Sequence, residues 1–162
     1  MEDIGLSEKE IKACQKEMAA LMEKFSSLEG AVLSTADGLL VASEDRSGNL
    51  EPDTISAISA SMISLADTLA GQAGRPEVNN IISEAESSTL VILHAGEMIL
   101  TVVGHHDTNI GLVLAAAKSA AKSIRMDTKE FSESLSGTNI LSDPEALLER
   151  VRKEMKEMRE GK

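Results

Sequence analysis

Three neighbouring side chains, His105, His106 and Asp107, are of the types that bind metal ions and stand close enough in the sequence to be weighed together. Adjacent residues on extended backbone point in different directions, so one metal ion would need a bent loop and further ligands. The alternative is a solvated loop between a strand and the helix that follows it. The sequence favours this loop, and we therefore expect no metal site and no cofactor.

Enzymatic motifs are missing from the rest of the sequence. It has no G-x-x-x-x-G-K-[ST] phosphate loop, no G-x-G-x-x-G cofactor turn and no G-x-S-x-G nucleophile elbow. The single cysteine, Cys14, lies on the apolar stripe of a predicted helix, which favours a packing role over a redox role. No serine is visibly paired with a base. We predict that this chain is not an enzyme.

Composition excludes two further classes of partner. The net charge is −11 and aromatic residues make up only 1% of the chain. Nucleic-acid binding needs basic patches and often aromatic stacking surfaces, and anionic membranes also attract basic surfaces. The acidic start, Met1-Glu2-Asp3, lacks a signal-peptide pattern, and no apolar run approaches the roughly 20 residues that span a bilayer. We expect a cytoplasmic protein that acts through contacts with other proteins, without nucleic acid and without membrane insertion.

Hydrophobic periodicity predicts the elements that position these residues. Ser7 and Glu10 have capping-box spacing, which predicts a helix from residue 7. The Asp37-Gly38 turn predicts a hairpin. The other predicted elements are a helix from Pro52, three strands near residues 78–86, 89–94 and 98–104, and a helix over residues 109–126. A basic stripe on this last helix, formed by Lys118, Lys122 and Arg125, fits a solvated face better than a site for an acidic partner.

The helix after Pro52 is unusual because Asp67 is the only charged residue between Thr54 and Gly74. An ordinary surface helix has a charged outer face, so we expect two sides of this helix to be shielded from water. We expect the large residues to pack on the chain's own sheet and the small-residue face to meet another subunit; the alternative is a helix buried wholly inside one domain. The large residues are Ile55, Ile58, Met62, Leu65 and Leu69, and the second face is built around Ser56, Ser59, Ala60 and Ile63.

We predict a domain over residues 7–126, a polar linker over residues 127–143 and a charged amphipathic helix over residues 144–160. The linker is rich in Ser, Gly and Asn. In the final helix, apolar residues recur at steps of three and four, at Leu148, Val151, Met155 and Met158. An isolated helix of this length is marginal in water, so we expect it to dock, to fold on binding or to fray.

The order of these elements, with the residues that form them, resembles the Roadblock (dynein light-chain) family. The resemblance covers roughly Ile11 to Ile124. It rests on the hairpin segment 30–43, the small-residue helix 55–70, the segment Ile81-Ile82-Ser83-Glu84, the hairpin 90–104 and the start of the last helix at 109–113. It implies an α+β fold of the Roadblock/profilin type, in which a five-stranded antiparallel sheet carries one helix on one face and two on the other. The charged helical tail is an addition to that fold.

The resemblance also implies a function. Stand-alone bacterial and archaeal members resemble MglB-type regulators of small Ras-like GTPases, which act as homodimers without inserting an arginine finger. The implied homodimer pairs third strands edge to edge with second helices side by side. Its expected interface residues are Ser56, Ser59, Ala60, Ile63, Ile81, Ile82, Ser83 and Glu84, and the expected partner-binding residues are Ile63, Asp67 and Ala70. The alternatives are a structural adaptor in a motor or signalling complex, a small-ligand sensor and, last, an enzyme.

Overall fold

The computed structural model describes residues 4–75, 77–138 and 144–161. The chain divides into two compact units, residues 1–128 and residues 129–162. The first unit contains eight elements: α1 (Glu8–Lys24), β1 (Leu28–Thr35), β2 (Leu40–Asp45), α2 (Pro52–Gln72), β3 (Ile81–Glu84), β4 (Ser88–Ala95), β5 (Met98–His105) and α3 (Ile110–Asp127).

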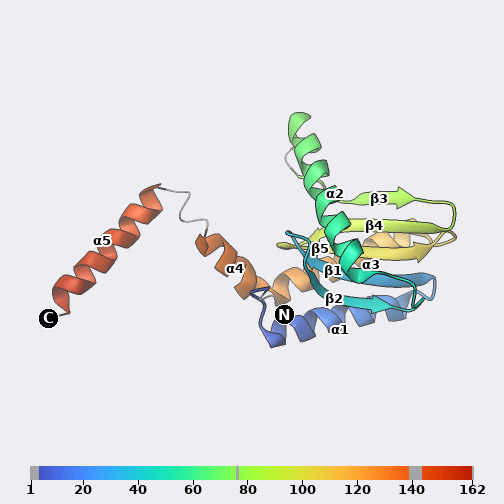
Figure 1. The fold of residues 1–162 in the computed structure, drawn as a ribbon, viewed down its shortest axis with the longest axis horizontal. Coiled ribbons are helices and arrows are strands. Elements are labelled where there is room, and N and C mark those ends of the chain that lie inside the picture. Colours follow the sequence, from blue (N-terminus) through green and yellow to red (C-terminus); the bar gives the residue numbers. More distant parts are fainter. Residues whose placement is uncertain (1–3, 76, 139–143, 162) are drawn as a thin grey trace. The chain divides into compact units, whose positions relative to one another are not determined.

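The first unit is built on an antiparallel five-stranded sheet in the order β2-β1-β5-β4-β3. Helix α2 crosses one face of the sheet, while α1 and α3 lie against each other on the opposite face (Figure 1). Because β4 and β5 are covered on both faces, their burial is nearly continuous, as their apolar sequences predict. The predicted fold class is confirmed.

Local sequence signals explain where the helices of this unit begin. The Ser7 hydroxyl accepts from the Glu10 amide at 3.2 Å, and the Ser7 amide donates to the Glu10 carboxylate at 2.8 Å, which is the predicted capping box. At α3, the Asn109 side chain accepts from the Leu112 amide and satisfies another unpaired helix donor.

The turn between β1 and β2 brings the backbone close to α2. Gly38 has φ +87°, a conformation that favours glycine, and an added Cβ would lie 3.0 Å from the Ala57 Cα. The Asp37-Gly38 dipeptide therefore does more than reverse the chain, because its glycine also lets the hairpin pass beneath α2.

The predicted faces of α2 are reversed in the structure. Ser56, Ser59, Ala60 and Ile63 are buried against the chain's own sheet. Ala60 and Ile63 pack with Ile92 and Ile99 from the strands. Small side chains let the helix axis approach the sheet closely, so these residues were correctly read as a close-packing face but were wrongly assigned to another subunit. Of the large apolar residues, Ile58, Leu65 and Leu69 are exposed, and Ile55 and Met62 are half-buried.

The second unit holds α4 (Lys129–Thr138) and α5 (Pro144–Glu160). Within the polar linker predicted over residues 127–143, residues 129–138 form the helix α4. Residues 139–143 of the predicted linker lie outside the described residues. Helix α5 agrees closely with the predicted terminal helix.

The sequence-based expectation about membrane spans needs one correction. Within the described residues, α2 is long enough and apolar enough to meet the length and composition test for a membrane span. This is weak evidence for a membrane role, because core helices of water-soluble domains pass the same test, and Ser56, Ser59 and Ile63 of α2 are buried on the sheet.

Candidate interaction surface

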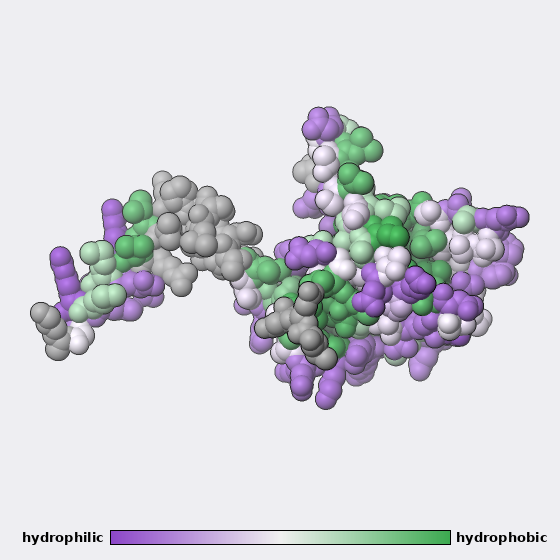
Figure 2. Space-filling view, viewed as in Figure 1, coloured by the Kyte–Doolittle hydropathy of each residue, from purple (hydrophilic) through white to green (hydrophobic). Residues whose placement is uncertain are grey.

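The outer side of α2 carries large apolar side chains that the rest of the first unit leaves uncovered. Ile58, Leu65 and Leu69 are 55%, 71% and 73% exposed. Figure 2 shows hydrophobic residues gathered over α2, and in Figure 1 the C-terminal end of the helix extends past β3. We call these three residues the α2 outer stripe. Exposed apolar residues grouped in this way are typical of an interaction surface.

An open sheet edge belongs to the same unit. In the described part of the chain β3 pairs with β4 on one side and has no partner strand on the other. An unpaired edge presents backbone N–H and C=O groups that another strand can bind. Ile82 on this strand is 41% exposed. The α2 outer stripe and the β3 edge thus give the unit both an apolar and a hydrogen-bonding surface.

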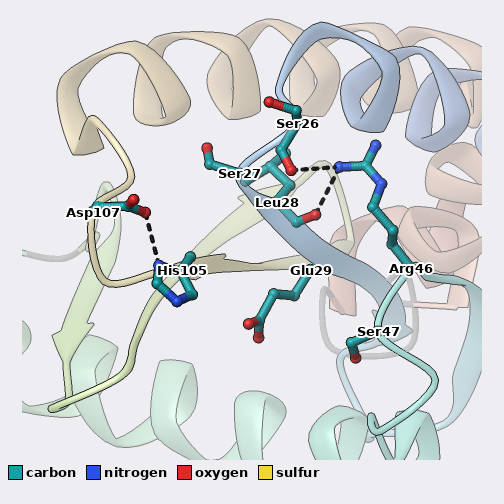
Figure 3. Close-up of a pocket in the computed structure, with 8 residues that line it drawn as sticks. All are labelled: Ser26, Ser27, Leu28, Glu29, Arg46, Ser47, His105 and Asp107. Atoms are coloured by element: carbon teal, nitrogen blue, oxygen red, sulfur yellow. Dashed lines mark hydrogen bonds and ion pairs between the residues drawn. The ribbon is translucent and has the colours of Figure 1, made fainter.

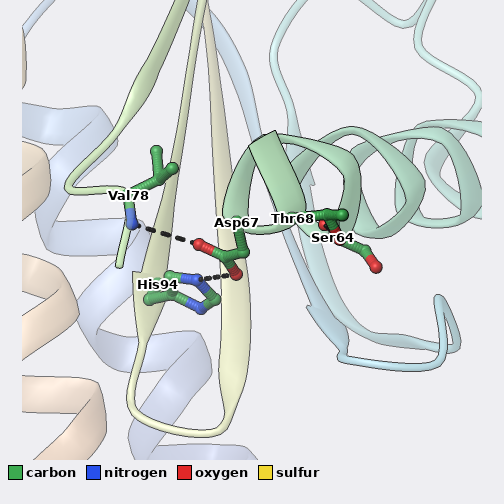
Figure 4. A network of polar contacts seen from close by, with 5 residues as sticks. All are labelled: Ser64, Asp67, Thr68, Val78 and His94. Carbon is green, nitrogen blue, oxygen red and sulfur yellow. Dashed lines mark hydrogen bonds and ion pairs between the residues drawn. The ribbon is translucent and has the colours of Figure 1, made fainter. Parts of the chain in front are cut away.

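Asp67 connects α2 to the segment that precedes β3. One of its carboxylate oxygens accepts from the Val78 amide at 3.1 Å, and the other lies 3.0 Å from His94 Nε2 on β4 (Figure 4). Asp67 therefore holds three segments together. The sequence assigned it to a binding surface and did not anticipate this structural role.

The predicted interface residues fall into three groups. Ser56, Ser59, Ala60 and Ile63 have almost no surface to offer a partner, because the chain's own sheet buries them. The β3 residues Ile81, Ile82, Ser83 and Glu84 stand on the open edge, half-buried or exposed. Asp67 and Ala70 are half-buried on the C-terminal half of α2. The expectation that the small-residue face meets another subunit is therefore corrected, because this face packs on the chain's own sheet, and the exposed apolar residues of α2 are those of the outer stripe.

An open pocket of about 440 Å³ lies elsewhere in the unit (Figure 3). Arg46 occupies one wall, and its guanidinium donates to the carbonyls of Met22 at 2.6 Å and of Phe25, Ser26 and Leu28 at 2.8–3.1 Å. Carbonyls at a helix C-terminus lack partners within the helix, so this arginine completes the end of α1.

The opposite wall of the pocket contains two of the three residues weighed for metal binding. His105 Nδ1 lies 2.8 Å from the Asp107 carboxylate, and this hydrogen bond lowers the pKa of Asp107. Among the described residues, no group of three or more His, Cys, Asp or Glu side chains is placed to hold a metal ion.

Cys14 is fully buried on α1. The pKa of its thiol is raised to about 11, mainly by burial and in addition by the nearby Asp127 and Glu10 carboxylates. Since the thiolate is the reactive form, this cysteine has the chemistry of a packing residue.

With this geometry established, comparison with known proteins identifies the family. The family model for the Roadblock/LC7 domain matches residues 15–104, from α1 to the end of β5. The chain belongs to the Roadblock/LC7 family.

Relatives and solved structures agree with this assignment. The Methanocaldococcus jannaschii uncharacterized protein MJ1340 is 26% identical over 104 residues, which are 64% of this chain and 90% of the relative. Myxococcus xanthus MglB superposes with a TM-score of 0.70 at 21% identity, over 77% of this chain and 94% of MglB. Acanthamoeba castellanii profilin IA matches at TM-score 0.52 and 16% identity, over 68% of this chain and 95% of profilin. At these identities the two solved structures establish the Roadblock/profilin-like fold.

Sequence reasoning missed two features of the Roadblock/LC7 domain. The exposed residues Ile58, Leu65 and Leu69 were placed in the core because large apolar residues usually go inside. A usable signal was the run of small residues at Ser56, Ser59 and Ala60, which suits close approach to a sheet. The capping role of Arg46 had no local signal, because its acceptors lie some 20 residues earlier in the chain.

Proposed function

We propose that this Roadblock/LC7 protein is a non-enzymatic homodimer that regulates a small Ras-like GTPase in the cytoplasm. The observation that carries the proposal is the α2 outer stripe, Ile58, Leu65 and Leu69, exposed on the same unit as an open β3 edge. The dimer would form through these two features, and the GTPase would bind across the paired second helices.

The proposed dimer contact has a clear physical basis. Burying a leucine side chain fully contributes about 1.5–3 kcal/mol, so two leucines from each subunit form a substantial apolar centre. Strand pairing between two β3 edges would satisfy backbone groups that otherwise face water. A two-fold axis lets one surface complement itself, which is the arrangement that a homodimer requires.

The assignment to a GTPase regulator is supported by the family resemblance rather than by a catalytic site. Resemblance to MglB-type proteins implies binding to a GTPase and altered hydrolysis. A regulator without its own chemistry would act by binding one arrangement of the partner's switch loops more tightly than the other. The chain offers binding surface for this role in the two α2 helices of the dimer.

The dimer is tested by sedimentation equilibrium at micromolar concentration. The wild type should sediment as a dimer, and the double variant Leu65→Asp/Leu69→Asp should be a monomer, because two charges enter an apolar contact. Leu112→Asp is the matched control, since Leu112 is 59% exposed on α3, on the other face of the sheet. A monomeric wild type would contradict the proposal.

The regulatory role is tested by single-turnover GTP hydrolysis, with small GTPases encoded in the same genome. One of them should bind the dimer and change its hydrolysis rate, and the monomeric double variant should lose this effect. Binding without any change in rate would favour the structural adaptor. No binding to any of these GTPases would contradict the proposed regulator.

A further inference from the structure

Helix α5 carries an apolar stripe that the rest of the second unit leaves uncovered. Leu148, Val151, Met155 and Met158 are between 44% and 75% exposed. The helix has 17 residues, and an isolated helix of that length is marginal in water. A stripe of this kind on a helix that is otherwise so polar needs a partner surface.

The spacing of the stripe indicates what kind of surface covers it. The four residues follow one another at steps of three, four and three, which are positions a, d, a and d of a heptad repeat. Between residues 152 and 160, all positions apart from Met155 and Met158 are charged and exposed. Leu147 adds an apolar residue at a g position, whereas over residues 151–160 the apolar residues are confined to a and d positions. A seam confined to a and d positions is typical of a two-stranded coiled coil, whereas a helix that docks on a globular domain has a wider apolar face.

We propose that α5 pairs in parallel with α5 of a second copy of the chain, forming a short two-stranded coiled coil. This inference rests on the proposed homodimer, because it assigns the second copy as the occupant of the seam. A helix pair arranged about the two-fold axis of a dimer is isologous, so each residue of the stripe meets the same residue of the other copy when the helices are parallel.

Charge complementarity favours the parallel orientation. In the heptad register, Glu154 is at a g position, while Arg152 and Arg159 are at e positions. Parallel coiled coils bring a g residue next to the e residue five positions later in the other helix, which pairs Glu154 with Arg159 of the second copy. An antiparallel arrangement would instead bring e positions together and place arginines opposite arginines.

Because the seam is short, the pairing of the α5 helices depends on dimerisation of the two first units. Two heptads are fewer than the three or four that usually sustain an independent coiled coil. When two copies are already joined, the second contact becomes intramolecular, with an effective concentration on the order of millimolar. A contact too weak to form between separate helices can then be populated.

Disulfide trapping in the full-length chain tests the proposal. Met158→Cys places a thiol in the seam, and Glu157→Cys places one at the neighbouring outward position as the matched control. Under mild oxidation, we expect covalent dimer to form at least about ten-fold faster for Met158→Cys, because only seam positions face their own copy. Cys14 should not contribute, because it is fully buried, and oxidised wild type verifies this.

Sedimentation of the same samples separates the two proposals. Equal crosslinking rates in a protein that sediments as a dimer would overturn the coiled coil and leave the domain dimer standing. A monomeric sample without crosslinking would overturn both. Fast crosslinking at residue 158, but not at residue 157, supports parallel pairing, because an antiparallel pair would place residue 158 opposite the start of the other seam.

Discussion

The Thr101 hydroxyl on β5 donates a hydrogen bond of 2.7 Å to the Ser59 hydroxyl on α2, and both residues are buried. This contact fixes which side of α2 faces the sheet. A hydroxyl shielded from water requires a hydrogen-bond partner, because an unpaired buried polar group is costly, and each of these two hydroxyls provides that partner for the other. The side of α2 that carries Ser56 and Ser59 is therefore the inner face, and Leu65 and Leu69 lie outside.

Removing one partner of this pair should destabilise the domain. Ser59→Ala leaves the buried Thr101 hydroxyl without its acceptor, and we expect a loss of about 1–3 kcal/mol in the free energy of unfolding. Thr101→Val, which removes the donor with little change in shape, should rescue part of that loss in the double variant. Urea unfolding of the two single variants and the double variant measures the coupling. Strictly additive losses would show that the hydrogen bond contributes nothing.

Ile63 and Leu65 are only two residues apart on α2, but their truncation should affect different properties: folding stability for Ile63 and dimerisation for Leu65. Ile63 is 3% exposed, so Ile63→Ala should cost about 2–5 kcal/mol in the free energy of unfolding. Leu65→Ala should change it by less than about 0.5 kcal/mol when measured in the monomeric state. It should instead weaken dimerisation. Thermal melts and sedimentation of the same samples provide the two readouts, and the opposite ranking would restore the face assignment expected from sequence.

Much of the fold could be predicted because its signals are local. The Ser7–Glu10 capping box and the Asp37-Gly38 turn each act within a few residues, and the structure contains both. The apolar runs of β4 and β5 likewise predicted strands covered on both faces. These features depend on periodicity and hydrogen bonding along one short segment.

The candidate site depended on longer-range information. Which side of α2 faces the sheet is decided by the distance between helix and strands, through contacts such as Ser59 with Thr101, 42 residues apart. The role of Asp67 similarly depends on Val78 and His94. Hydropathy alone ranks leucine above serine for the core, and it therefore predicts the wrong side of α2 as the one that faces the sheet.

Cys14 should be inert in the folded protein. Its thiol is buried and its pKa is raised to about 11, so at pH 8 it is protonated as well as inaccessible. A thiol-specific reagent such as DTNB should react with it only after denaturation. Raising the pH toward 11 would favour the thiolate, while burial should still slow the reaction. Rapid labelling of native protein at pH 8 would contradict the assignment of Cys14 to the core.

Arg46 and Arg75 test whether the protein supplies a catalytic arginine to the proposed GTPase partner. Both are exposed, but only Arg46 is held by four backbone carbonyls around the end of α1. These four hydrogen bonds fix the position of the Arg46 guanidinium against the end of α1. A guanidinium held in this way is not available to reach a nucleotide in another protein.

Arg46→Ala should therefore lower stability and leave regulation intact. Losing hydrogen bonds from a charged donor at a helix end should cost about 1–3 kcal/mol in the free energy of unfolding. Arg75→Ala, the matched control, should have almost no effect on stability. In single-turnover assays below the melting temperature, both variants should change GTP hydrolysis as the wild type does. An arginine finger is worth about 10³–10⁵ in rate, so its loss could not be overlooked. Loss of the effect in Arg75→Ala, with its fold unchanged, would show that the protein does contribute a catalytic residue.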